Sequence, residues 1–357
     1  MFGKIESLRG VAACLVILFH SPFNYGMQPL TFITNSYLFV DFFFILSGFV
    51  MSFAYKRKIG NGLTFQYYIL LRLARVYPLH IFMLIAWIPY VLVKQYLYTS
   101  GIGGSDPSET ANIYSFISNF LLIHSMGLHN YLSWNNPSWS ISSEFFAYII
   151  FFIATRTIDR KNYLFTPLVI SIACYAMLFN LDYKNFDFTY DYGFLRCIAS
   201  FYLGVFIYRL RKLEIKINLI PILEVLSVTS LIVAVIYSDL GNVAIIITMI
   251  SFSATILVFT SSENGYLGKI LESHIMRSIG LWSYSIYMIH ALIVAGISNF
   301  FEYVLEIDLN NSLGLMAILI NGSLVLLTIL ISKYSYLYIE KRFRDLAKQK
   351  IMNKYKS

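Results

Sequence analysis

The chain has 357 residues, of which 58% are hydrophobic and only 13% are charged, whereas soluble domains usually carry about 25% charged residues. Apolar stretches near twenty residues long recur along the whole sequence, and each is long enough to cross the hydrocarbon core of a bilayer as a helix. This composition argues against a soluble enzyme and predicts an all-α, polytopic transmembrane helical bundle.

The apolar stretches predict ten spanning helices. In chain order they are 8–26, 36–55, 68–94, 139–155, 163–180, 193–209, 217–238, 242–261, 279–299 and 313–336. A further apolar segment, 112–128, is predicted to form a re-entrant or interfacial helix on the outer side. If it crossed the membrane, the basic C-terminal residues would lie outside the cell, against the positive-inside rule.

Charge in the loops predicts the orientation of the bundle. Basic residues cluster in Lys56–Lys58, Arg156–Lys161 and Arg209–Lys216, and again after Glu340, whereas the alternate loops are neutral or acidic. With ten spans, every basic cluster falls on the cytoplasmic side, together with both termini. The net charge of +8 is thereby explained without nucleic acid as a partner. The three cysteines lie in apolar segments and lack metal-ligand spacing, so neither a disulfide framework nor a metal site is predicted.

Two ionisable residues in the first span need an explanation, because ionisable groups inside spans are costly and often functional. Arg9 and His20 are eleven residues apart, which places them on one helix face about 16 Å apart along the axis. Arg9 would anchor an anion at the inner surface, and His20 would lie near the midplane. On this segment alone, an arginine that extends to lipid headgroups and a hydrogen-bonded structural histidine explain the pattern equally well.

Three more polar residues lie inside later spans. Ser140 and Glu144 are spaced i, i+4 on one face at the start of the fourth span. Glu144 is interpreted as a partner for a buried cation or as a proton-handling group. His290 lies near the middle of the ninth span, beside Tyr284 and Tyr287. It is interpreted either as a second acid or base or as a structural hydrogen-bonding residue.

Arg72 and Arg75 lie about one helical turn apart at the cytoplasmic start of the third span. Together with Arg9 they suit a phosphate-rich cytosolic ligand, because guanidinium groups bind phosphates in a bidentate manner. A histidine farther inside the bundle, such as His20, can act as a general base near neutral pH. The remaining histidines are assigned to interfacial or loop positions: His80, His124, His129 and His274.

In their order along the chain, these motifs resemble the acyltransferase-3 family of integral-membrane acyltransferases, which typically O-acetylate bacterial surface glycans. The resemblance runs the length of the chain and is carried by IESLRGVAACLVILFH, VDFFFILSGFVMS, RLARVYPLH, SWSISSEFFAY, RCIASFYLGVFIY, GLWSYSIYMIH and YIEKRFR. Two positions depart from the family pattern. Phe145 stands where the family often has a second acid, and Arg342 stands where it often has proline.

The resemblance implies acetyl-CoA, or another acyl-CoA, as cytosolic donor substrate. It implies a hydroxyl of a surface glycan (lipopolysaccharide O-antigen, capsule or exopolysaccharide) as acceptor on the outer side of the bacterial cytoplasmic membrane, and no prosthetic group. Arg9 and His20 correspond to the residues regarded as essential in the family. Residues 1–340 are then a transmembrane acyltransferase domain, and 341–357 a basic cytoplasmic tail.

The resulting hypothesis gives each candidate a role. Arg9, Arg72 and Arg75 bind the phosphates of the donor, and His20 is the general base or a transient acyl carrier. Ser140 and Glu144 orient His20 or the sugar, and His290 is a second acid or base. A transporter or flippase for a glycan or lipid intermediate is an alternative, as is an acyltransferase acting on an amino sugar or a lipophilic metabolite. The oligomeric state, a homo-oligomer included, stays open.

Overall fold

The computed structural model describes residues 2–23, 30–102, 104–157, 165–181, 186–211, 219–261, 265–307 and 314–354. Within these residues all regular structure is helical and no strand occurs. The predicted all-α class is therefore confirmed.

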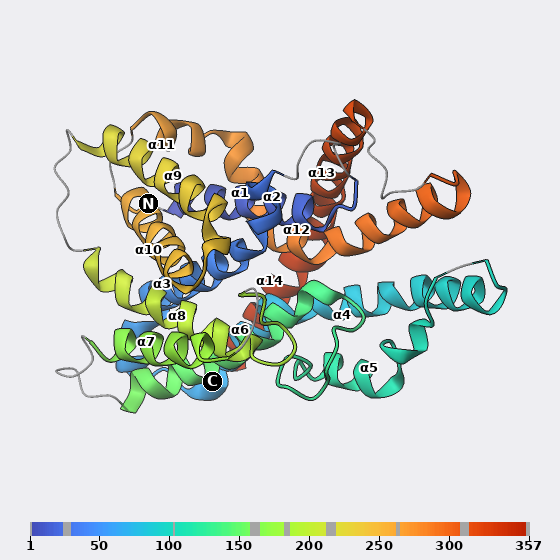
Figure 1. Cartoon of the computed structure of the whole chain (residues 1–357). Helices are drawn as coiled ribbons and strands as arrows, with labels where there is room; N and C mark the ends of the chain where they lie inside the picture. Colours follow the sequence, from blue (N-terminus) through green and yellow to red (C-terminus); the bar gives the residue numbers. More distant parts are fainter. Residues whose placement is uncertain are drawn as a thin grey trace.

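Within the described residues, ten long helices form the body of the protein, and Figure 1 shows their arrangement. They are α1 (Phe2–His20), α3 (Phe39–Gly60), α4 (Phe65–Thr99), α6 (Trp139–Thr157), α7 (Thr166–Phe179), α8 (Gly193–Leu210), α9 (Ile220–Ile236), α10 (Asn242–Phe259), α12 (His274–Asn299) and α13 (Leu315–Ser335). The shorter α-helices are α2 (Thr31–Thr34), α5 (Ile113–Phe120), α11 (Tyr266–Leu271) and α14 (Arg342–Lys354). Two segments have π-helical hydrogen bonding: η7 (Phe300–Val304) and η8 (Tyr336–Lys341).

Seven helical segments of the described residues are long and apolar enough to cross a membrane. They are Thr31–Gly60, Phe65–Thr99, Asn136–Thr157, Gly193–Leu210, Asn242–Phe259, His274–Val304 and Leu315–Lys350. The apolar helices α7 and α9 have 14 and 17 residues, and α1 carries three charged residues near its start. Each predicted span coincides with one long helix, but ten complete crossings remain a prediction.

Some sequence predictions fall outside the described residues. These are the predicted span ends at 24–26, 163–164, 217–218 and 313, the loop residues Arg160, Lys161, Lys212 and Lys216, and the end of the tail at 355–357.

The segment predicted as one helix over 112–128 is shorter than expected. Only α5 is α-helical there, and its eight residues span about 12 Å, less than half of the hydrocarbon thickness. It lies beside α4 (Figure 1), where Tyr77 Oη donates to the carbonyl of Phe120 at 3.0 Å. The helix therefore does not cross the bilayer by itself.

Glycines allow α3 and α8 to pack at backbone contact. A Cβ atom added to Gly48 would lie 1.9 Å from the carbonyl oxygen of Phe201, and one added to Gly204 would lie 1.8 Å from that of Ile45. Both contacts are with backbone atoms, which cannot move away as the end of a flexible side chain could. Small residues at such crossings are typical of helix packing in membranes, where close approach provides van der Waals contact.

Glycines also allow α1 and α12 to pack at backbone contact. A Cβ added to Gly280 would lie 2.3 Å from the carbonyl oxygen of Glu6, and one added to Gly10 would lie 2.8 Å from the amide nitrogen of Gly280. Ten residues farther along each helix, about 15 Å away, His20 and His290 also lie side by side. The two helices therefore run parallel, and their glycine contact sets the register of the histidines.

A buried ion pair fastens α3 to α8. The Nη2 atom of Arg196 lies 2.7 Å from Oδ2 of Asp41, and both side chains are fully buried. Ser200 Oγ donates to the other carboxylate oxygen at 2.7 Å. Buried charges persist when they are paired and hydrogen-bonded in this way. The sequence analysis gave neither ion-pair residue a role.

We expect Gly280→Ala to destabilise the protein by about 1–3 kcal/mol, because the new methyl group would force α1 and α12 apart. Thermal unfolding in detergent measures this. Gly296→Ala on the same helix is the matched control, since nothing lies within 4 Å of its added Cβ. Equal melting temperatures for the two variants would show that the glycine contact is not required.

Candidate functional site

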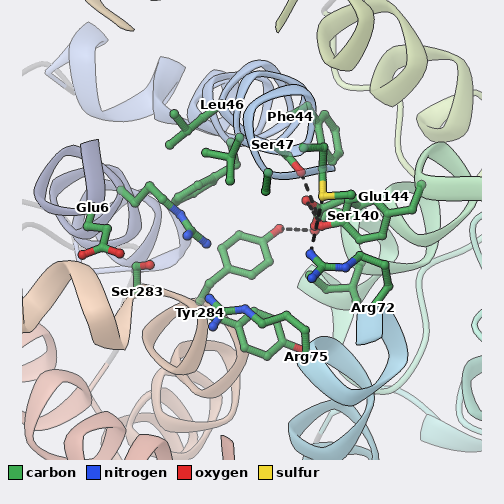
Figure 2. A pocket seen from close by; sticks show the side chains of 18 of the residues that line it. Glu6, Phe44, Leu46, Ser47, Arg72, Arg75, Ser140, Glu144, Ser283 and Tyr284 are labelled. Atoms are coloured by element: carbon green, nitrogen blue, oxygen red, sulfur yellow. Dashed lines mark hydrogen bonds between the residues drawn. The ribbon is translucent and has the colours of Figure 1, made fainter. Parts of the chain in front are cut away.

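A cavity of about 390 Å³ lies among α1, α3, α4, α6 and α12, with one residue contributed by α14. Along α3 its lining extends from Val40 to Tyr55, a rise of about 22 Å. Figure 2 shows Arg72, Ser140 and Glu144 on one side of the cavity and Glu6 and Ser283 on the other. We call its two ends the Arg9 end and the His20 end, after the residues at the start and end of α1.

The three predicted anion-binding arginines all line this cavity, and Arg344 of α14 joins them. Arg9 is the eighth residue of α1, and Arg72 and Arg75 are the eighth and eleventh residues of α4. Because α1 and α4 both begin at this end, their arginines meet there. The sequence analysis assigned Arg344 to a basic tail and missed its place at the cavity.

The cavity arginines have different partners. Arg72 donates to the hydroxyl of Tyr55 and lies over its ring, with the guanidinium carbon 4.5 Å from the ring centroid. Arg75 pairs with Glu340, with 3.1 Å between Nη1 and Oε1. Among the described residues, no carboxylate lies within 4.0 Å of Arg9. Arg9 is thus the cavity arginine most available to an anionic ligand.

Glu340 is a site residue that sequence reasoning missed. Its side chain is fully buried, accepts from Ser285 Oγ at 3.0 Å, and lies 3.8 Å from Nη1 of Arg344 in addition to its contact with Arg75. It belongs to the π-helical η8, and π-helical turns recur at functional sites. The sequence feature that could have indicated this role is an acidic residue at the end of the last apolar stretch.

Ser140 and Glu144 line the cavity as neighbours on α6. Glu144 accepts a hydrogen bond from Tyr148 Oη at 2.6 Å. Ser140 Oγ lies 2.9 Å from the hydroxyl oxygen of Tyr287. Within the described residues, no hydrogen bond joins either side chain to His20. Their contacts place them along the cavity wall rather than against the histidine that they were expected to orient.

The two histidines predicted from separate spans form a pair. Nε2 of His290 lies 3.3 Å from Nδ1 of His20. His290 is fully buried, and His20 is exposed at the end of α1. Neither histidine belongs to the cavity lining. The rings of Tyr287 and His290, 5.8 Å apart between centroids, connect the cavity to the pair.

The hydrogen bonds assign the ring protons of this pair. Nδ1 of His290 lies 2.7 Å from the carbonyl oxygen of Tyr287, so Nδ1 carries the hydrogen and Nε2 accepts. Nδ1 of His20 then donates, shared between His290 Nε2 and the carbonyl of Val16 at 2.9 Å. In the neutral pair, Nε2 of His20 is left with its lone pair. This nitrogen can accept a proton from a hydroxyl group.

A second group of histidines is buried. His124 and His129 lie in the loop after α5, as predicted, whereas His80 lies inside α4. All three side chains are buried, and the rings of His80 and His124 stack 5.9 Å apart. His80 donates through Nε2 to the carbonyl of Asn119 at 2.8 Å, which ties α4 to α5. Burial lowers the pKa of His124 to about 3, so its ring is neutral at physiological pH. His274 is exposed at the start of α12, as expected.

Among the described residues, no group of three or more His, Cys, Asp or Glu side chains is arranged to hold a metal ion. The cavity lining instead includes four arginines and several hydroxyl groups against two carboxylates, Glu6 and Glu144, and this excess of positive charge suits an anionic organic ligand.

We expect Glu340→Gln to lower the free energy of unfolding by about 1–3 kcal/mol, because Arg75 loses its buried counter-charge while the side-chain shape is kept. Thermal unfolding in detergent measures the loss. Glu302→Gln at an exposed position of η7 is the control and should stay within about 0.5 kcal/mol. An unchanged melting temperature for Glu340→Gln would show that the carboxylate does not hold Arg75.

Comparisons with known proteins identify the family of the chain. A curated relative, "Protein 2 in picA locus" of Rhizobium radiobacter, is 28% identical over 189 residues, covering 50% of this chain and 93% of the relative. No solved structure matches the chain. A family model described as an acyltransferase domain matches residues 2–336, nearly the whole chain. The chain therefore belongs to the acyltransferase-3 family and is a membrane acyltransferase.

Proposed function

We propose that this membrane acyltransferase moves an acetyl or other short acyl group from cytosolic acyl-CoA to a hydroxyl of a surface glycan on the opposite side of the bacterial cytoplasmic membrane. The observation that carries the proposal is the arrangement of the bundle. A cavity with arginines at one end reaches toward a histidine with a free ring nitrogen at the other.

The Arg9 end is assigned to the cytosol. The basic residues Lys56–Lys58 at the end of α3 and the basic helix α14 lie at the same end of the bundle as the start of α1. Basic residues concentrate on the cytoplasmic side of membrane proteins. With this orientation, His20 lies toward the outer leaflet, where a surface glycan is presented.

In this proposal, the arginines at the Arg9 end bind the charged part of the donor, and the cavity along α3 accommodates the rest. Arg9 takes a phosphate of the CoA moiety, since no carboxylate competes for it among the described residues. Arg72 and Arg75 contribute further positive charge and are held in place by Tyr55 and Glu340. The pantetheine arm then follows α3, and the thioester arrives at the His20 end.

His20 acts as the general base. Its Nε2 takes the proton of the acceptor hydroxyl while the hydroxyl oxygen attacks the thioester carbonyl carbon. The tetrahedral intermediate collapses, the carbon–sulfur bond breaks, and the thiolate of CoA takes the proton back from His20. The products are the glycan ester and free CoA.

His290 orients the base. Its Nε2 accepts the Nδ1–H of His20 and so fixes the tautomer whose Nε2 faces the acceptor. It also stabilises the imidazolium that forms on His20 during attack. In a Ser-His-Asp triad a carboxylate accepts the Nδ1–H of the catalytic histidine, and here the buried neutral His290 has that role.

A glycan or lipid transporter would also place ionisable residues in the bundle. The family to which the chain belongs favours the acyltransferase. Exposed tyrosines on α5 and before α8, Tyr114 and Tyr192, suit stacking against sugar rings, which favours a glycan over a lipophilic metabolite as acceptor.

We expect His20→Ala to lower acyl transfer by about 10²-fold or more, because general-base catalysis contributes 10²–10⁴ in rate. Transfer of radiolabel from acetyl-CoA to a surface-glycan fraction by purified protein in proteoliposomes measures this. Arg9→Ala should instead raise the KM for acetyl-CoA, with kcat less affected.

His274→Ala is the matched control, since this histidine is exposed and lies far along α12 from the pair. It should transfer label at the native rate. Near-native transfer by His20→Ala would overturn the assignment of the base. Absence of transfer from any acyl-CoA by the native protein would overturn the donor.

A further inference from the structure

The cavity ends before it reaches the histidine pair. Its lining at the His20 end includes Phe43, Ser140 and Tyr287, but neither His20 nor His290. Tyr287 contacts both the cavity lining and the histidine pair, because its ring centroid lies 5.7 Å from that of Phe43 and 5.8 Å from that of His290. The two rings therefore line the end of the cavity that faces the histidine pair.

Tyr287 is held firmly in this position. Only 6% of it is exposed, and its hydroxyl donates to the carbonyl of Pro137 at 3.1 Å. Ser140 Oγ lies 2.9 Å from the same hydroxyl oxygen and also donates to the Pro137 carbonyl at 3.0 Å. These contacts tie the ring on α12 to the start of α6.

Phe43 completes the barrier from α3. It contacts Tyr287 edge to face and packs against apolar residues of both the main core and the smaller cluster formed by α1, α12 and α13. Val40, Phe44 and Ile141 line the cavity beside it. The end of the cavity is therefore mainly apolar, with the hydroxyls of Ser140 and Tyr287 at its wall.

We propose that Phe43 and Tyr287 form the wall of the acyl subsite and limit the acyl group to short chains. This inference rests on the proposed function, since it takes the cavity as the donor site. Packed interiors deform little, so a longer chain meets the two rings rather than displacing them. One methylene in such a pocket changes discrimination by about 10–200-fold.

The test compares acyl chain lengths by binding, so that it does not depend on the acceptor. Non-hydrolysable thioether analogues of acetyl-CoA and butyryl-CoA are titrated into the full-length protein in detergent. The native protein should bind the two-carbon analogue at least tenfold more tightly than the four-carbon analogue. Phe43→Ala should reduce this ratio to about threefold or less, because the wall is removed on one side.

Phe53→Ala is the matched control on the same helix, since Phe53 is exposed and does not line the cavity. It should keep the native ratio. Phe43→Leu keeps an apolar but smaller side chain, so we expect an intermediate ratio of the two affinities. This variant replaces Phe43→Ala if the alanine variant does not fold. The same order in kcat/KM for acetyl-CoA and butyryl-CoA is expected.

The outcomes separate the two claims. If the native protein binds the two analogues equally, or if both Phe43 variants keep the native ratio, the acyl-subsite assignment is wrong while the acyl-CoA donor stands. If the native protein binds neither analogue, the donor assignment fails, and the subsite fails with it.

Discussion

The backbone contact between α1 and α12 is the constraint on which the candidate site depends. Gly280 approaches the carbonyl of Glu6 so closely that any Cβ atom would overlap with it. In a bilayer, helices gain little from apolar burial, and such close approach supplies the association. Because the helices run parallel, the contact at Gly10 and Gly280 also determines which residues meet about 15 Å farther on, and these are His20 and His290. The pairing is thus a consequence of helix register.

The ionic residues of the bundle fall into two groups. Arg196 is fully buried and fully matched by Asp41, and Ser200 completes the carboxylate. Desolvation makes such a pair a weak source of stability, but removal of one partner leaves an uncompensated buried charge. Arg9, in contrast, lines a cavity and has no carboxylate within ion-pair distance among the described residues. An arginine that the fold leaves without a counter-charge, at the wall of a cavity, is the one that an anionic ligand can complete.

Periodicity and span length predicted much of this arrangement. The apolar stretches located the long helices, and the spacing of Arg9 and His20 placed both on one side of α1. Periodicity gives the face of a helix but not the neighbour that this face contacts, so the His20–His290 pair could not be read from either segment. Glu340 was not predicted as a site residue because it follows the last span, where an acidic side chain is normally expected to be in water. The π-helical turn in which it is buried has no simple sequence signal. His80 and His124 were assigned to interfacial or loop positions, and sequence pattern alone could not show that their rings stack in the interior or that His80 bonds to α5.

The bundle keeps its charge-binding end and its base apart, and this separation has a chemical reason. A thioester in open contact with water and a base is exposed to hydrolysis, and enclosed sites suppress that side reaction. Tyr287 and Phe43 close the cavity toward the histidines, while His20 is exposed on the other side of them. Donor and acceptor can therefore approach the base from opposite ends of α1 without sharing a water-filled path. The ring of Tyr287, tied by its hydroxyl to Pro137 and Ser140, lies against both the end of the cavity and His290, so the thioester, the acceptor hydroxyl and the base must meet beside this ring.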